Sequence, residues 1–198
     1  MPLDVDQTQR RQDVARAAAA LIAERGMSAV TFRNLAAALG CSTTAISHYF
    51  PNRTSILLET YRFVLARAVS RRAVPPGADP GEKLASLDKI LPIAAEQWDD
   101  WVVWLCFWTE ALFDPDLASE QKLHSRETRE TIEAMLRTLG CGAEEARDLS
   151  QKVMTTIYGI AVQAAFDREH WTPEVQRRAL REVLEPALPL ADLRRASG

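Results

Sequence analysis

Apolar residues recur along most of the chain at the three- and four-residue spacing of a helix, and no stretch alternates apolar and polar residues as a strand would. Prolines and glycines interrupt this pattern and divide it into segments of helical length. The pattern therefore predicts an all-α fold of about nine helices, with polar, frayed residues at 1–8. The expected helices are 10–25, 32–39, 43–50, 53–73, 80–91, 99–113, 117–139, 143–168 and 172–188.

The stretch from Thr31 to Phe50 predicts two short helices joined by a tight turn. Thr31 and Ser42 stand where their hydroxyls can cap the two helices, and Gly40 stands where a left-handed backbone favours glycine. Pro51 ends the second helix. The expected buried positions are Phe32, Leu35, Ala36 and Leu39, followed by Ile46, Tyr49 and Phe50. These features form a helix-turn-helix, whose second helix can enter the major groove of DNA with its N-terminal residues first.

Residues 40–53, GCSTTAISHYFPNR, resemble the signature of TetR-family transcriptional repressors, roughly G-V-S-x-x-x-[LIV]-[YS]-x-[YH]-F-x-x-[KR]. The resemblance extends upstream through Glu24-Arg25-Gly26 and Thr31-Phe32, and it covers about the first third of the chain. The run ISHYF at 46–50 is most similar to the choline-responsive BetI-type branch. Many relatives have lysine, glycine and tyrosine at positions 43, 44 and 47, so the operator preference of a generic member does not transfer to this chain.

The resemblance implies a homodimer that binds a palindromic operator and is released by a small molecule. It also implies a DNA-binding domain at 1–52, a connecting helix at 53–73, and a ligand-binding and dimerisation domain at 74–190, followed by a loose tail at 191–198. Prolines and a glycine at 75–77 mark the boundary. Helices 143–168 and 172–188 are expected to form the dimer surface. The apolar residues of these two helices support this expectation, because they exceed what one narrow face needs: Val153, Ile157, Ile160, Ala161, Ala164, Leu180, Val183, Leu184 and Leu188.

Polar residues on the second helix of the motif are the candidate DNA contacts, since short hydroxyls and imidazoles reach both base edges and phosphates. Tyr49 is open to two interpretations, a core residue or a phosphate contact. The alternative for Arg33 and Arg53 is a solvated charge without a partner. The complete candidate set is Thr31, Arg33, Ser42, Thr43, Thr44, Ser47, His48, Tyr49 and Arg53.

The segment from Gln97 to Phe113 holds four of the five tryptophans. Trp101, Trp104 and Trp108 share a helix face, with Phe107 and Glu110 beside them. Aromatic faces near a carboxylate can hold an organic cation, and residues 104–108 also resemble the BetI type. A plain core, a neutral apolar ligand and no ligand remain alternatives. The candidate ligand residues are Trp101, Trp104, Phe107, Trp108, Glu110, Met154, Tyr158 and Phe166. Gly159, in mid-helix, predicts either that another helix crosses closely, which is the preferred interpretation, or that the pocket needs room there.

The net charge of −3 is unevenly distributed. Residues 1–72 have 10 Lys and Arg and 5 Asp and Glu, whereas the remaining residues have 14 Lys and Arg and 22 Asp and Glu. A basic front on an acidic body suits contact with a polyanion. Three scattered cysteines, a polar N-terminus and no long apolar run predict a cytoplasmic protein without a metal site or membrane span. We expect no cofactor. A DNA-binding adaptor without a ligand and, far behind, an all-α enzyme are the alternative functions.

Overall fold

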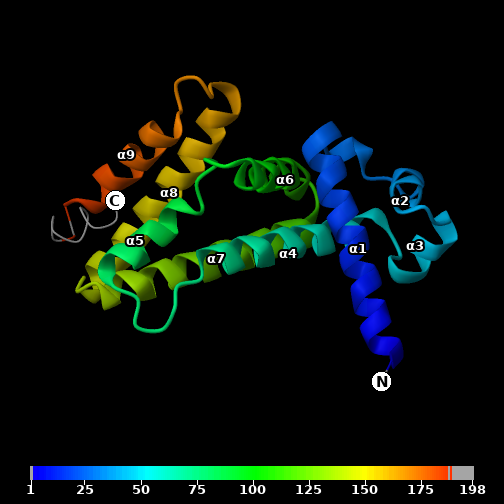
Figure 1. Ribbon diagram of the computed structural model, residues 1–198, viewed down its shortest axis with the longest axis horizontal. Helices are drawn as coiled ribbons and strands as arrows, with labels where there is room; N and C mark the ends of the chain where they lie inside the picture. Colours follow the sequence, from blue (N-terminus) through cyan, green and yellow to red (C-terminus); the bar gives the residue numbers. More distant parts are fainter. Residues whose placement is uncertain (1, 187, 189–198) are drawn as a thin grey trace. The chain divides into compact units, whose positions relative to one another are not determined.

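The computed structural model describes the backbone of residues 2–186 and 188, and the side chains of residues 7–186 and 188. The predicted loose tail at 191–198 lies outside the described residues. Within this range the chain is all-α, with nine α-helices and one short 3-10 turn, as the sequence predicts (Figure 1). The elements are α1 Pro2–Arg25, η1 Met27–Ala29, α2 Phe32–Leu39, α3 Thr43–Tyr49, α4 Arg53–Arg72, α5 Pro80–Asp88, α6 Ala95–Ala111, α7 Pro115–Thr138, α8 Ala143–Phe166 and α9 Pro173–Leu184.

Some helix ends differ from the prediction because apolar spacing fixes the middle of a helix better than its limits. Helix α1 begins at Pro2, so the prediction of frayed residues up to about 8 is wrong for the described backbone; proline is suited to a first helical position. Helix α6 begins at Ala95 rather than at Asp99. Gln97 accepts a hydrogen bond from the backbone N–H of Ala94 at 2.8 Å and so caps this start.

The described helices divide into two compact units. The first combines residues up to Val69 with Trp98–Gln121, and the second combines Ser70–Gln97 with the described residues from Lys122 onward. The predicted boundary at 74–77 therefore differs from the observed grouping, because most of α6 and the start of α7 pack with the N-terminal helices. None of the described helices has the length and apolar character needed to span a membrane.

In the first unit, α1 packs against η1, α2 and α3 (Figure 1). The small residues Ala15 and Ala18 of α1 are fully buried and permit this close approach. Leu35, Ile46 and Phe50 fill the space between the helices with at most 1% exposure, which agrees with their predicted core positions. This core fixes α2 and α3 as a unit.

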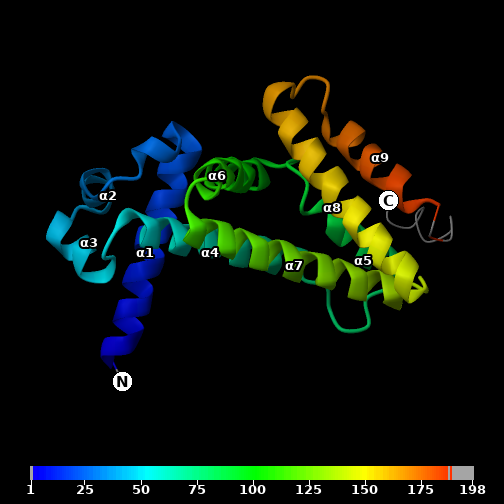
Figure 2. The ribbon, with the colours of Figure 1, turned by 180° about the vertical axis from the view of Figure 1, so that it is seen from behind.

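In the second unit, α8 and α9 lie side by side (Figure 2). The apolar residues of these helices that support the predicted dimer surface are mostly buried between helices of the single chain. The buried members are Val153, Ile157, Ile160, Ala161, Ala164, Leu180, Leu184 and Leu188. A close helix crossing at Gly159 is not found within the chain, because nothing lies within 4 Å of the position that its Cβ would occupy.

Candidate nucleic-acid interface and effector helix

Local hydrogen bonds shape the helix-turn-helix as the sequence predicts. The Thr31 hydroxyl accepts from the Asn34 N–H at 3.1 Å and caps α2. Gly40 ends that helix with φ of 64°, a left-handed conformation that favours glycine. The Ser42 hydroxyl accepts from the Ala45 N–H at 3.1 Å and caps α3. The two caps and the glycine turn therefore determine where α3 starts and in which direction it leaves α2.

Helix α3 presents one buried face and one exposed polar face. Ile46 is buried, whereas Thr43, Thr44, Ser47 and His48 are all exposed. The remaining candidate on this helix, Tyr49, is half-buried, and its ring meets that of His48 edge-on at 5.1 Å. Thr31, Arg33 and Ser42 are also exposed beside it. The hydroxyl and imidazole groups of α3 are thus available to an external partner.

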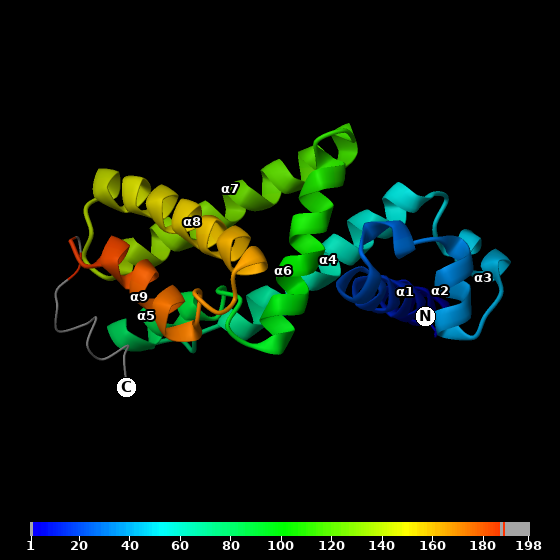
Figure 3. The same ribbon diagram turned by 90° about the horizontal axis from the view of Figure 1, so that it is seen from above.

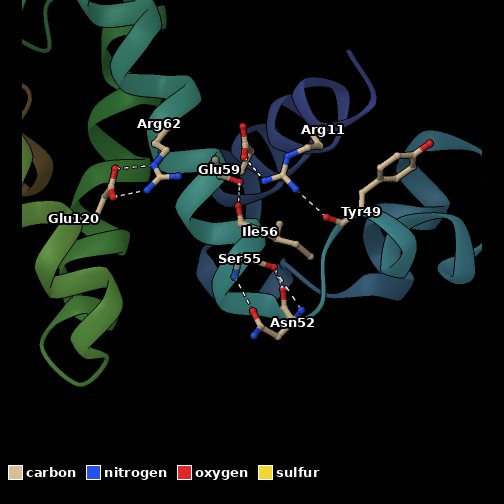
Figure 4. Close-up of polar contacts among 9 residues, drawn as sticks. Arg11, Tyr49, Asn52, Ser55, Ile56, Glu59, Arg62 and Glu120 are labelled. Atoms are coloured by element: carbon tan, nitrogen blue, oxygen red, sulfur yellow. Dashed lines mark hydrogen bonds and ion pairs between the residues drawn. The ribbon is translucent and has the colours of Figure 1, made fainter. Parts of the chain in front are cut away.

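Arg11 of α1 clamps the C-terminal end of α3 (Figure 4). Its Nη1 donates to the Tyr49 carbonyl at 2.8 Å, its Nη2 pairs with Glu59 of α4, and its guanidinium lies 4.5 Å from the centre of the Phe50 ring. Sequence reasoning missed this role. The available signal was an arginine on the same helical stripe as the buried residues Ala15 and Ala18.

Replacing Arg11 by alanine is expected to destabilise the protein by about 1 kcal/mol, because a hydrogen-bonded charge is lost from a partly exposed site. A loss of this size lowers the melting temperature of a chain of this length by about 2–4 °C, measured by thermal denaturation. The exposed Arg25→Ala is the matched control and should leave the melting temperature unchanged. Equal melting curves for Arg11→Ala and the parent protein would contradict the clamp.

Arg53 stands at the first position of α4, and its donors point inward. Its Nε donates to the Val30 carbonyl at 3.3 Å, and Nη2 donates to the Met27 carbonyl at 2.9 Å. Its Nη1 and Nη2 also bind the two carboxylate oxygens of Glu110 on α6, at 3.0 and 3.3 Å. The sequence predicts a phosphate contact for Arg53, but such a contact competes with these internal acceptors. These internal bonds favour a structural role for Arg53 over a contact with DNA.

The packing also changes the predicted charge asymmetry. Within residues 1–69, the first unit has eight Lys and Arg residues and five acidic residues. Within residues 98–121, it has six acidic residues and no Lys or Arg, so the unit as a whole has more acidic than basic residues. Arg62 illustrates the effect: it forms a two-pronged hydrogen bond with Glu120 of α7 at 2.7 and 2.8 Å, which raises the pKa of its guanidinium (Figure 4). DNA binding by this unit must therefore depend on local groups rather than on an overall positive charge.

Helix α6 turns its aromatic residues into the first unit. Trp101 and Phe107 are buried, and Phe107 stacks on Tyr61 of α4 with ring centres 4.0 Å apart. The Trp108 Nε1 donates to the side-chain oxygen of Gln121 on α7 at 2.7 Å, and the Tyr61 hydroxyl donates to the same oxygen. Most of this aromatic face is therefore packed core, which was one of the alternatives that the sequence left open.

Trp104 differs from its neighbours. It is 7% exposed, and its indole Nε1 is a buried donor for which the described residues offer no acceptor. Its ring meets that of Trp101 edge-on at 4.8 Å. One turn earlier, Asp100 is fully buried and paired with Arg67 of α4. Glu110, the carboxylate expected beside an organic cation, is already paired with Arg53.

The second group of candidate ligand residues lies in the second unit. Met154 is buried and Tyr158 is half-buried, whereas Phe166 is 87% exposed at the end of α8. Burial raises the pKa of the Tyr158 phenol, while its hydrogen bond with Ser125 and the positive charges of Arg72 and Arg129 act in the opposite direction. The charges that act on Tyr158 are therefore cationic and would repel an organic cation there.

Known proteins are similar to this chain in sequence and in fold. A family model described as BetI-type transcriptional repressor, C-terminal, matches residues 82–189, and the model for bacterial regulatory proteins of the tetR family matches residues 15–60. The transcriptional regulator BetI of Burkholderia cenocepacia is 29% identical over 171 residues, which are 79% of this chain and 82% of that protein. BetI of Cronobacter sakazakii is 26% identical over 191 residues, which are 91% and 93% of the two chains.

Two solved structures extend the comparison. A transcriptional regulator from Rhodococcus sp. Rha1 shares the fold, with a TM-score of 0.80 and 23% identity over 89% of this chain and 97% of its own. A regulator from Saccharomonospora viridis, solved in complex with choline, has a TM-score of 0.76 and 26% identity over 90% of this chain and 96% of its own.

The all-α fold and the capped helix-turn-helix, which exposes a polar second helix, indicate a DNA-binding transcriptional regulator. This chain belongs to the TetR family, and its C-terminal part is of the BetI type, a match that spans more than half of the sequence. Members of this family are transcriptional repressors and not enzymes. The resemblance carried by residues 40–53 is thereby confirmed.

Proposed function

We propose that the protein is a ligand-released repressor that binds a palindromic operator as a homodimer, with one α3 helix in each of two successive major grooves. The observation that carries this proposal is the exposed polar face of α3, which stands on a buried core and has a cap at one end and the Arg11 clamp at the other. A short recognition helix needs such support, because it contributes few contacts and must hold them in register.

The proposed contacts with DNA fall into two classes. Thr43, Thr44, Ser47 and His48 are exposed along α3 and are assigned to base edges and thymine methyl groups. The exposed residues Thr31, Arg33 and Ser42 and the half-buried Tyr49 flank this face and are assigned to phosphates. Phosphate contacts fix the register of the protein on DNA, and the base contacts select the sequence.

The proposed dimer surface is the outer face of α8 with the adjoining edge of α9. Gly159, Val162 and Phe166 follow one another along this face and are all exposed in the single chain. A glycine within an exposed helix lowers helix stability by about 1 kcal/mol relative to alanine. A partner helix that crosses closely at Gly159 would explain why a glycine stands there. A groove of about 440 Å³ between α8 and α9, lined by Thr155 and Val183 among others, continues the surface.

The proposed effector is a small molecule that contacts α6, and choline is the first candidate because the related regulator from Saccharomonospora viridis was solved with it. Trp104 is the proposed contact on α6, since its buried Nε1 requires an acceptor and the hydroxyl oxygen of choline is one. Trp101 and Phe107 are assigned to the packed core that holds Trp104 in place. For Met154 and Tyr158, which lie in the second unit, the ligand role stays a prediction from the sequence, whereas Glu110 and Phe166 have other assignments.

Choline is expected to quench the tryptophan fluorescence of the protein with a saturable curve and to release it from DNA taken from upstream of its own gene, in a mobility-shift assay. Trp104→Phe should weaken choline binding about 3- to 10-fold, because one hydrogen bond is lost. Trp98→Phe, half-buried on the same helix, is the control and should bind choline as the parent does. A choline-independent mobility shift would favour the adaptor without a ligand.

A further inference from the structure

Arg53 joins three segments of the first unit at a single guanidinium group. The carbonyl of Met27 belongs to η1, and the carbonyl of Val30 belongs to the link that leads directly into α2. The third acceptor, Glu110, lies in the last turn of the effector helix α6. One side chain therefore connects the base of the helix-turn-helix with the end of α6.

Helices α4 and α6 lie next to each other (Figure 3), and the Arg53 connection is one of several side-chain contacts between them. Immediately after Arg53, the Thr54 hydroxyl donates to Asp114 at 3.1 Å, just beyond the end of α6. Further along α4, Tyr61 stacks on Phe107, and the last of these contacts is the ion pair of Arg67 with Asp100. From Arg53 through Tyr61 to Arg67 on α4, the partners on α6 run back from Glu110 through Phe107 to Asp100. The two helices therefore run in opposite directions and are held together at both ends.

The Arg53 guanidinium is almost fully used in hydrogen bonds to acceptors within the protein. A guanidinium has five N–H donors, and the four hydrogen bonds to Met27, Val30 and Glu110 leave it little capacity for a phosphate. A partly exposed ion pair alone contributes little to stability. The planar fork, however, orients two backbone carbonyls and a carboxylate at once, which a lysine could not do.

We propose that Arg53 and Glu110 form a positioning pair that transmits the position of α6 to the helix-turn-helix. The pair acts through the Met27–Val30 link, which sets where α2 and therefore α3 stand. This inference rests on the proposed function, in which α6 contacts the effector. Coupling between two sites is reciprocal, so DNA that fixes the helix-turn-helix must also shift the surroundings of α6.

The reciprocity permits a test without an effector. Trp171→Phe leaves tryptophans only on α6, at positions 98, 101, 104 and 108. The probe is a duplex that the parent protein selects from a random DNA pool, so no operator has to be known in advance. We expect saturating duplex to change the tryptophan emission of Trp171→Phe, and Glu110→Gln in this background to lose at least half of that change. The Glu110→Gln change should also lower the affinity of this protein for the duplex about 5-fold or more.

Two variants distinguish the orienting role of the Arg53–Glu110 pair from the effect of losing a charge. Glu120→Gln removes a carboxylate from the similar Arg62 pair, which joins α4 to α7 instead of α4 to α6, and should keep the emission change. Arg53→Lys retains the positive charge but not the fork and should lose the emission change as Glu110→Gln does. Combining Arg53→Lys with Glu110→Gln should add little to either single change.

The outcomes are distinct. Tighter DNA binding by Glu110→Gln, with a steeper dependence on salt concentration, would mean that Arg53 is a phosphate contact restrained by Glu110, and would overturn the proposal. An unchanged emission response in Glu110→Gln, or none in Trp171→Phe with DNA bound, would also overturn it. Failure of the parent protein to select any duplex would instead overturn the proposed function.

Discussion

Replacing both Ser47 and His48 by alanine is expected to weaken operator binding about 30-fold or more, with a smaller loss for each single change. The reason is that these exposed side chains of α3 are the proposed base contacts, and a good base contact contributes about 1–3 kcal/mol of discrimination. The measurement is a titration by fluorescence anisotropy at fixed salt concentration. The fold should be retained, because neither side chain takes part in the core.

The matched control is Thr131→Ala combined with His170→Ala, since both residues are exposed and lie outside the first unit. This variant should bind the operator as the parent does. If the two double variants bind equally well, α3 does not read the bases, and the groove assignment is wrong.

Replacing Phe166 by glutamate is expected to convert the protein to a monomer and to lower operator affinity at least about 100-fold. Burying a carboxylate in an apolar interface is costly, so the dimer should dissociate. A monomer binds only one half-site and loses the additional affinity that comes from binding two linked half-sites. Sedimentation equilibrium should give a mass near the 22.1 kDa of one chain for the variant and twice that for the parent.

The chain provides a close control for this change. Phe113 is 89% exposed, almost the same as Phe166 at 87%, but it lies in the first unit after the end of α6. Phe113→Glu should remain a dimer. A dimeric Phe166→Glu protein would place the subunit interface elsewhere than on the outer face of α8.

The helix-turn-helix could be predicted closely because local chemistry determines it. Thr31 and Ser42 cap helices through backbone groups three residues away, and Gly40 adopts a left-handed conformation that few other residues tolerate. These interactions need no information about distant parts of the chain. The same local reasoning correctly placed the start of α5, where Asp79 and Glu82 form a reciprocal cap.

The roles of the arginines could not be predicted, because their partners are far away in the sequence. Arg53 binds Glu110 and Arg11 binds Glu59, at separations of 57 and 48 residues. Periodicity shows that a charged residue lies on a helix face but does not show which carboxylate faces it. The grouping of α6 with the N-terminal helices was missed for the same reason.

The dimer surface shows a related limit of sequence reasoning. Ile157, Ile160 and Leu180 have the spacing of buried positions, and they are buried, but within a single chain. Spacing predicts burial without indicating whether the covering residues come from the same chain or from a partner. The surface proposed instead lies on the opposite face, where Gly159 and Phe166 are exposed on a helix that would otherwise favour alanine and polar residues there.

Methylation protection of guanine N7 on the selected duplex tests the central claim most directly, because this atom lies in the major groove. The proposed dimer predicts two protected patches about 10 base pairs apart, or a multiple of one helical turn, and both should disappear in the protein with Ser47→Ala and His48→Ala. A bound duplex with no protected guanine in its major groove, or protection that survives these changes, would contradict a repressor that reads DNA through α3.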